Sequence, residues 1–192
     1  NSCIRYMQGF PSIEGCVHLS VEAGCGGTTF ALQIARDILL QNSHVIWVCN
    51  EMPDGGRMAQ IFSEAPPTAV SKLHVAVVGE NITQGISSAI GLMLELDSLG
   101  LIVIDDWAPK SGQVPPDSSS KVKEIIKLSE SRNVPLLLIS AAYEDASGKS
   151  GWKSRGSIDI DTWFLHISDI FLHISAHIPC IFPGCVSKNR EW

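Results

Sequence analysis

Short, continuous apolar runs alternate along the chain with longer segments in which apolar residues recur at helical spacing. The continuous runs predict strands covered on both faces, and the spaced residues predict helices with one buried face. The predicted strands cover residues 16–20, 44–49, 73–78, 101–106 and 134–140, and the predicted helices cover 28–40, 56–63, 86–96 and 121–131. This alternation predicts an α/β fold with a mainly parallel sheet, whose ligand site lies at the carboxyl ends of the strands. A loop is expected over residues 109–120, which are rich in Pro, Ser and Gly.

A glycine-rich turn joins the first predicted strand to the first predicted helix. It reads Val-Glu-Ala-Gly-Cys-Gly-Gly-Thr-Thr-Phe from Val21 to Phe30. Backbone amides in such a turn and at the helix N-terminus can hold a phosphate, and glycines let the backbone approach it. Gly26, Gly27 and Thr28 fall on the end of the phosphate-loop pattern G-x-x-x-x-G-K-[ST]. Gly27 replaces the lysine and Val21 replaces the first glycine, so a plain strand-turn-helix connection stays open as the alternative.

Two acids follow predicted strands at the same edge of the sheet. Asp105 ends the run Leu-Ile-Val-Ile-Asp-Asp, where a carboxylate can hold Mg²⁺ beside a nucleotide. A capping or loop acid is the alternative for Asp105. Glu51 follows strand 44–49, where it could orient or deprotonate the water that attacks a γ-phosphate, or be a solvated turn residue. Because parallel strands bring these ends together, we expect Gly26, Glu51 and Asp105 around one cavity.

Taken together, these segments resemble the RecA-superfamily P-loop ATPases, the group of RecA, RadA-like recombinases, DnaB-type helicases and KaiC-like proteins. The glycine turn and first helix resemble a degenerate Walker A motif. Residues 45–53, Val-Ile-Trp-Val-Cys-Asn-Glu-Met-Pro, resemble the strand that ends in Glu-Met, and residues 101–106 resemble Walker B. The resemblance implies one RecA-like domain over residues 1–192, built as a three-layer, mainly parallel sheet with helices on both faces. ATP and Mg²⁺ are the ligands that it implies.

The resemblance also implies roles for individual residues. Glu51 becomes the catalytic base, and Thr28 and Asp105 become the Mg²⁺ ligands. The phosphates are held by the loop residues Gly24, Cys25, Gly26, Gly27, Thr28 and Thr29. Residues 188–190, Lys-Asn-Arg, resemble the K-x-R element that contacts a neighbouring subunit's nucleotide. This implies a catalytic role for Lys188 and Arg190 in a homo-oligomer or an assembly with related RecA-like subunits.

Two departures from the family pattern both affect nucleotide chemistry. Gly27 stands for the lysine, and Ala141 stands for the glutamine that ends the strand over 134–140. A charge-assisted hydrogen bond contributes about 1.5–3 kcal/mol, so losing the lysine should weaken ATP binding by roughly one to two orders of magnitude. Hydrolysis should suffer more, because the lysine also offsets charge in the transition state. Four lysines could compensate: Lys110, Lys149, Lys153 or a neighbour's Lys188. A Gly27→Lys variant tests how the loop lost its function, because restored hydrolysis would indicate that the rest of the site is intact.

Residues 144–155 predict a flexible loop that could bind single-stranded DNA. Lys149, Lys153 and Arg155 could contact the backbone while a base stacks on Trp152. The segment Ser-Arg-Gly-Ser from residue 154 resembles the one that follows the second DNA-binding loop of the helicases. A solvated surface loop remains the alternative.

A short repeat, Phe-Leu-His-Ile-Ser, occurs at residues 164–168 and 171–175. Its alternation predicts paired strands, as a β-hairpin-like C-terminal edge of the sheet. His166, His173 and His177 are interpreted as the polar face of these strands rather than as metal ligands.

Composition narrows the class of protein. A chain of 192 residues with 45% hydrophobic and 18% charged residues predicts one soluble globular domain. No apolar run is long enough for a membrane span and no leader is recognisable, so the cytoplasm is expected and no membrane partner. Six scattered cysteines predict reduced thiols rather than a zinc site or disulfides. The net charge of −6 argues against a surface built broadly for nucleic acid, although a local basic segment is compatible with it.

The sequence therefore predicts a RecA-like ATP-binding protein of DNA recombination, repair or replication, with ATPase activity weakened or lost. The alternatives are a catalytically inactive structural or regulatory subunit and a KaiC-like signalling ATPase.

Overall fold

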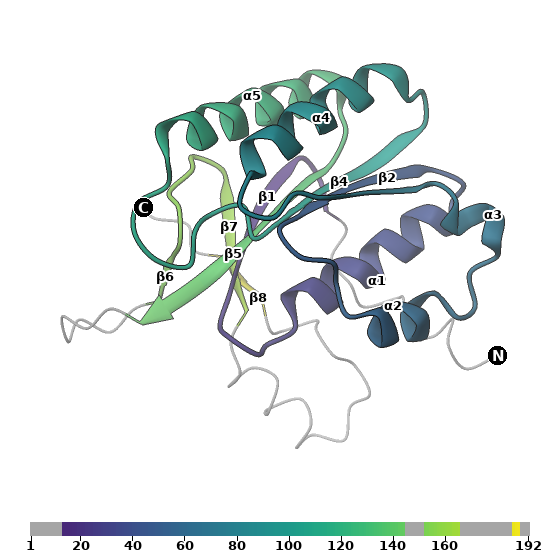
Figure 1. Cartoon of the computed structure of the whole chain (residues 1–192), viewed down its shortest axis with the longest axis horizontal. Coiled ribbons are helices and arrows are strands. Elements are labelled where there is room, and N and C mark those ends of the chain that lie inside the picture. The colour runs from purple at the N-terminus through teal and green to yellow at the C-terminus, as the bar shows by residue number, and fades with distance from the viewer. Residues whose placement is uncertain (1–12, 145–151, 166–185, 189–192) are drawn as a thin grey trace.

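The computed structural model describes residues 13–144, 152–165 and 186–188, and its centre is an eight-stranded sheet (Figure 1). The strands are β1 (Cys16–Val21), β2 (His44–Cys49), β3 (Leu73–Val77), β4 (Leu99–Asp105), β5 (Leu136–Glu144), β6 (Trp152–Ser154), β7 (Asp161–Leu165) and β8 (Val186–Lys188). Their order is β3-β2-β4-β5-β1-β7-β8, with β6 paired to β5. All pairs from β3 to β7 are parallel, whereas β6 and β8 run antiparallel to β5 and β7. The mainly parallel sheet and the antiparallel C-terminal edge are thus confirmed.

Helices cover both faces of the sheet, as the three-layer prediction requires. They are α1 (Gly27–Leu40), α2 (Gly55–Phe62), α3 (Pro67–Val70), α4 (Ile82–Glu95) and α5 (Pro116–Arg132). Figure 1 shows α4 and α5 on one face and α1, α2 and α3 on the other. Each face has its own apolar core, with Phe30 and Leu39 in one and Ile86, Met93 and Ile125 in the other, all at most 1% exposed. Burial on both faces explains why the strands are continuous apolar runs.

Three helices begin earlier than their apolar periodicity predicts, because polar caps and proline set their starts. The α2 helix begins after Asp54, whose side chain accepts a hydrogen bond from the Arg57 amide, and α4 begins after Asn81. The α5 helix begins at Pro116, since proline fits the first helical position. The loop expected over 109–120 is therefore shorter, and Ser118 is buried in α5 beside Thr83 with 2.8 Å between their hydroxyl oxygens.

Residues 152–154 form a strand, which corrects the expectation of a loop over 144–155. β6 extends the edge of β5, with Ser154 opposite Ala142 and Trp152 opposite Glu144. Residues 145–151, which include Lys149, lie outside the described residues.

The first copy of the repeat begins inside β7, and the strand that pairs with β7 is β8, with Lys188 opposite Trp163. The second copy, the three histidines His166, His173 and His177, and Arg190 lie outside the described residues. Across the described ranges, the search for a helix with the length and hydropathy of a membrane span finds none.

Candidate nucleotide site

The glycine-rich turn after β1 contains one backbone hydrogen bond and two glycines with left-handed backbone angles, the second of which leads into α1. The Cys25 amide donates to the Glu22 carbonyl over 3.1 Å, and Gly24, with φ of 83°, takes the position of a type II turn that favours glycine. Gly26 caps α1 with φ of 77°. The first bond of α1 runs from the Phe30 amide to the Gly26 carbonyl. The amides before it have no partner within the helix, which makes the start of α1 suited to an anion.

A hydrogen bond links the start of α1 to the end of β4. The Thr28 hydroxyl donates to Oδ2 of Asp105 over 2.9 Å, although the two residues are 77 positions apart. Asp105 is 6% exposed. Burial raises the pKa of its carboxyl to about 6, and the neighbouring charge of Asp106 also raises it, while the bond from Thr28 acts in the opposite direction. A carboxylate and a hydroxyl held together here are oxygen ligands of the kind that Mg²⁺ prefers.

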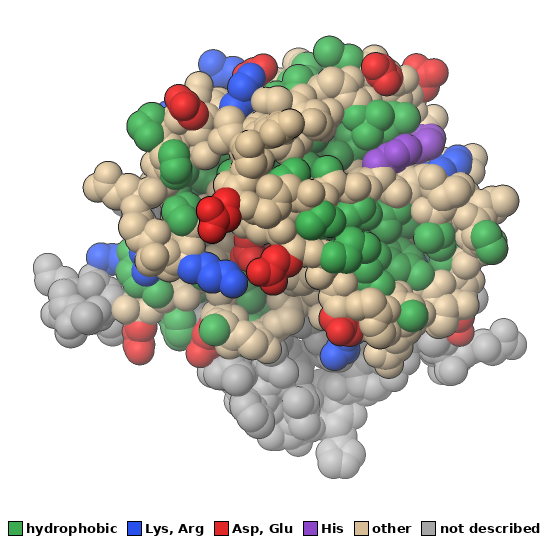
Figure 2. All heavy atoms as spheres, in the orientation of Figure 1, with side chains coloured by type: hydrophobic (Ala, Val, Ile, Leu, Met, Phe, Trp, Pro, Cys, Tyr) green, Lys and Arg blue, Asp and Glu red, His purple; other side chains and the backbone are tan. Residues whose placement is uncertain are grey.

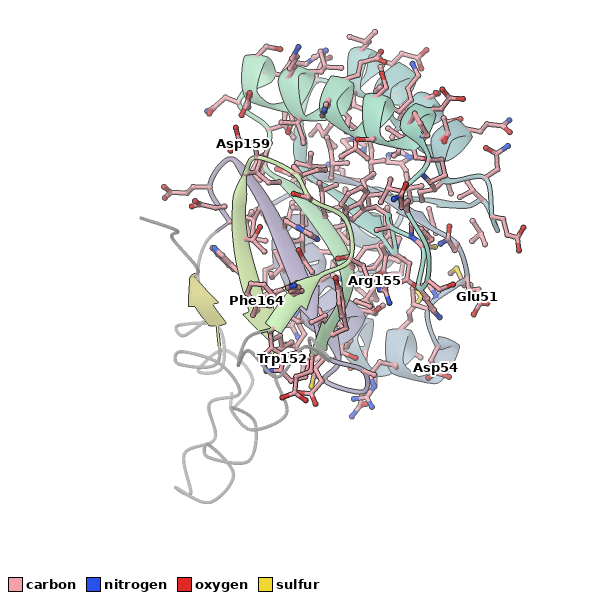
Figure 3. The ribbon with its side chains drawn as sticks, turned by 90° about the vertical axis from the view of Figure 1, so that its left-hand side faces the viewer. Glu51, Asp54, Trp152, Arg155, Asp159 and Phe164 are labelled. Carbon is pink, nitrogen blue, oxygen red and sulfur yellow. The ribbon has the colours of Figure 1, made fainter. Side chains whose placement is uncertain are left out.

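Thr28, Glu51 and Asp105 border one cavity of about 400 Å³. Its lining comprises Thr28, Thr29, Leu32, Cys49, Asn50, Glu51, Met52, Pro53, Asp54, Arg57, Asp105 and Asp106. Gly24, Cys25, Gly26 and Gly27 form the turn that leads to it. Figure 3 shows Glu51 and Asp54 on the same side of the molecule, and Glu51 is exposed. Gly26, Glu51 and Asp105 were expected around one cavity: Glu51 and Asp105 line it, whereas the segment after the glycine turn contributes Thr28 and Thr29 and not Gly26.

Asn50, Asp54 and Arg57 also border this cavity and were not singled out in the sequence. Asn50 donates from Nδ2 to the Asp106 carbonyl over 3.0 Å, and Asp106 has a left-handed φ of 57°. This contact fixes the sharp bend after β4. For Asp54 and Arg57, the available signal was Asp-Gly-Gly-Arg after strand 44–49, which is typical of a helix N-terminus.

Val21 and Gly27, the two residues that depart from the phosphate-loop pattern, lie next to each other. A Cβ on residue 27 would lie 2.6 Å from Cγ2 of Val21 and 3.1 Å from its Cγ1. Val21 therefore fills the space that a side chain at position 27 would need. A lysine at position 27 would therefore require the branched side chain of Val21 to be removed or displaced.

Of the residues expected to bind DNA, Trp152, Lys153 and Arg155 belong to the described residues and lie in or next to β6. Trp152 and Lys153 border a separate cavity of about 600 Å³, together with Tyr143 and Phe164. Figure 3 shows Trp152 and Phe164 near each other at one end of the β6 and β7 strands. The Arg155 guanidinium lies 4.4 Å from the centre of the Tyr143 ring, in cation–π geometry. Arg155 is thus partly engaged within the protein, whereas Lys153 is exposed.

Two of the lysines considered as replacements for the loop lysine are separated from the Thr28–Asp105 pair. Lys110 borders an adjoining cavity of about 480 Å³, which shares Asn50, Glu51 and Asp106 with the first. Lys153 borders the cavity beside β6.

The fold described above, a mainly parallel sheet with helices on both faces, is shared with two solved structures. Among solved structures, the chain is similar to the RadB recombinase, with a TM-score of 0.62 and 17% identity over 86% of this chain and 82% of that one. It is also similar to a DnaB-like replicative helicase, with a TM-score of 0.58 and 12% identity over 83% of this chain and 49% of the helicase. The match thus spans about half of the helicase chain. No family model matches the sequence, and no curated protein matches it either.

Proposed function

We propose that this protein is a RecA-like ATP-binding protein of DNA recombination, repair or replication, whose ATPase activity is weakened or lost. The observation that carries the proposal is the 2.9 Å hydrogen bond between Thr28 and Asp105, at a cavity that Glu51 also borders. In this proposal, Thr28 and Asp105 form the metal side of a phosphate-transfer site and Glu51 is its base, while the loop lysine is absent. The similarity of fold to a recombinase and a replicative helicase supports the same conclusion.

Each part of the cavity has a chemical task in this proposal. The amides at the start of α1 hold the phosphates, and the oxygens of Thr28 and Asp105 hold Mg²⁺. Mg²⁺ neutralises phosphate charge when bound. Glu51 accepts a hydrogen bond from the attacking water and orients it in line with the γ-phosphate. Because Glu51 is exposed, it can exchange protons with solvent.

The charges around the cavity predict slow chemistry. Among the residues that the structure describes, four carboxyl groups border it, those of Glu51, Asp54, Asp105 and Asp106, against the one cationic side chain of Arg57. A triphosphate is repelled by such a lining, so we expect binding to depend strongly on Mg²⁺. The packing of Val21 against Gly27 favours the alternative function, a structural or regulatory subunit without turnover, because it excludes a side chain at the lysine position.

Calorimetric titration with ATP and Mg²⁺ tests the proposal, with Thr28→Val as the variant that removes the hydroxyl at nearly constant shape. We expect measurable binding by the natural chain, and weaker Mg²⁺-dependent binding by the variant. Phosphate release measured on the same samples then separates slow hydrolysis from none. Failure of the natural chain to bind ATP or ADP with Mg²⁺ would overturn the ATP-binding function.

The partners follow from the same proposal. Single-stranded DNA is the proposed ligand of the surface around Trp152 and Lys153, and a homo-oligomer or related RecA-like subunits are the proposed assembly. The cytoplasm is the proposed location, since the unbridged thiols of Cys16 and Cys49 suit a reducing compartment.

A further inference from the structure

Within the described part of the chain, Arg57 is the cationic residue that lines the cavity bordered by Thr28 and Asp105. It lies in the first turn of α2, where its backbone amide donates to Oδ1 of Asp54 over 2.7 Å. Within the described residues, its guanidinium has no hydrogen bond or ion pair. We propose that Arg57 supplies the positive charge that the loop lysine would supply, by contacting the terminal phosphate of a nucleoside triphosphate in this cavity. This inference rests on the proposed ATP binding.

The loop cannot supply the charge itself. Val21 fills the space beside Gly27, with Cγ2 only 2.6 Å from where a Cβ would lie. A cation must therefore reach the phosphates from another element. Guanidinium suits this task because it presents two parallel donors to phosphate oxygens and stays charged at every working pH.

The α2 helix holds Arg57 in a defined place. Asp54 caps the helix, and Ile61 and Phe62 are buried in the core that also contains α1. Figure 2 shows acidic side chains gathered near the centre of this face of the molecule. Four carboxyl groups line the cavity itself, and their negative charge favours a cation beside it.

The position of Arg57 indicates which phosphate it contacts. Thr28 and the α1 amides lie on the loop side of the cavity, where the inner phosphates are held. Arg57 and Glu51 both belong to the segment that follows β2, and both line the cavity. Because Glu51 is the proposed base for the water that attacks the terminal phosphate, we assign Arg57 from the same segment to that phosphate. A contact made there distinguishes a triphosphate from a diphosphate.

Two lysines of the described residues, Lys110 and Lys153, were also considered as the source of this charge, and both border other cavities. Lys110 lines the adjoining cavity without Thr28 or Asp105, and Lys153 lines the one beside β6. Removing Lys110 therefore tests whether any nearby cation has the same effect.

The experiment compares binding of ATP and ADP, each with Mg²⁺, by calorimetry for the natural chain, Arg57→Ala, Arg57→Lys and Lys110→Ala. Arg132→Ala is the matched control, because it removes the same charge from an exposed position in the last turn of α5. We expect Arg57→Ala to weaken ATP binding by about tenfold to a hundredfold and ADP binding by less than about threefold. Arg57→Lys should recover part of the loss, and Lys110→Ala and Arg132→Ala should bind as the natural chain does.

Three results overturn the inference, and they are distinguishable. If Arg57→Ala binds ATP as tightly as the natural chain, Arg57 has no phosphate contact while the proposed function stands. If ATP and ADP weaken equally, the terminal-phosphate contact is wrong. If the natural chain binds neither nucleotide, the ATP-binding function fails and the inference with it. Thermal unfolding and far-UV circular dichroism of each variant check that the fold is intact.

Discussion

At the scale of single residues, two buried ionisable groups respond to pH in opposite directions. His18 is fully buried in β1, with Nε2 2.7 Å from the Ser140 hydroxyl, and burial lowers its pKa to about 4. Asp105 is the opposite case, since burial raises its pKa to about 6. The native protein therefore keeps His18 neutral and holds Asp105 ionised at neutral pH against a free-energy penalty.

The His18→Gln variant should reveal the first effect. As pH falls from 6.5 toward 4, the unfolded chain takes up the His18 proton before the folded one does, so the native state loses up to about 3 kcal/mol. Glutamine can keep the hydrogen bond to Ser140 without titrating. We expect the variant to be less stable at pH 7 and to close the gap in free energy of unfolding by pH 4, as measured by urea denaturation. A gap independent of pH would contradict this account.

The Asp105→Asn variant should reveal the second effect. The folded pKa lies above the reference value, so stability is greatest at low pH and falls as pH rises from about 4 to 6. The amide avoids the buried charge, so without divalent metal we expect it to stabilise the fold at pH 7.5 by up to about 3 kcal/mol. The gain should vanish near pH 4.

Thermal unfolding in the presence of a chelator measures this gain in stability. Glu51→Gln, at an exposed position, is the control, and its stability should differ little from that of the natural chain. The same Asp105→Asn protein should lose Mg²⁺-dependent ATP binding. A variant less stable than the natural chain at pH 7.5 would show that the Thr28 bond outweighs the burial of charge.

Residue identities alone predicted Thr28, Glu51 and Asp105, because each stands at a defined distance from an apolar strand or glycine turn. Arg57 could not be found in this way. Its significance depends on the cavity that it borders, which is set by the packing of α2 against α1 rather than by neighbours in sequence.

At the scale of elements, β1, the glycine turn and α1 act as one unit. Because Val21 at the end of β1 packs against Gly27 at the start of α1, the two positions should show coupled effects. The pattern G-x-x-x-x-G-K-[ST] identified both departures, but sequence spacing could not show that they compensate each other.

A double substitution tests this coupling. We expect Gly27→Lys alone to destabilise the fold by about 1–3 kcal/mol through overpacking against Val21. Adding Val21→Gly should remove the clash and let ATP bind at least about tenfold more tightly than in the single variant. Thermal unfolding and ATP titration of both single variants and the double variant provide the comparison. Equal ATP affinity for Gly27→Lys with and without Val21→Gly would show that the two positions are independent.

The element boundaries that the sequence missed have local causes. Periodicity places the start of α5 at its first apolar residues, whereas Pro116 starts the helix by its fixed backbone angle. β6 is only three residues long and forms by pairing with β5. The Gly, Ser and Lys residues in and around it are typical of a loop, which is why the sequence predicted one. A strand this short depends on its pairing partner, here residues 142–144 of β5, and composition does not report such a pairing.

At the scale of the whole molecule, the net charge of −6 restricts any contact with nucleic acid to a local surface. We expect Trp152→Ala and Lys153→Ala to weaken binding of a labelled oligothymidine, measured by fluorescence anisotropy at several salt concentrations. Lys153→Ala should also reduce the salt dependence, because it removes a phosphate contact. Lys123→Ala on the exposed side of α5 is the control. No binding by the natural chain at low salt would refute a DNA role for this surface.

The alternation of strands and helices was sufficient to predict a parallel, three-layer sheet, since few arrangements bury such strands on both faces. It did not predict the strand order. That order depends on which crossover each helix makes, and the chain returns β5 and β7 to either side of β1 from distant positions.

The central place of β1 has a consequence for biosynthesis. Its hydrogen-bonding neighbours are β5 and β7, whose partner residues follow more than a hundred positions later. The glycine-rich turn therefore leaves the ribosome long before the strands that flank it exist, and such distant pairings form slowly. A nascent chain that stops short of Leu136 carries the turn without either strand that pairs with β1, and its apolar first strand is then exposed to chaperones or to aggregation.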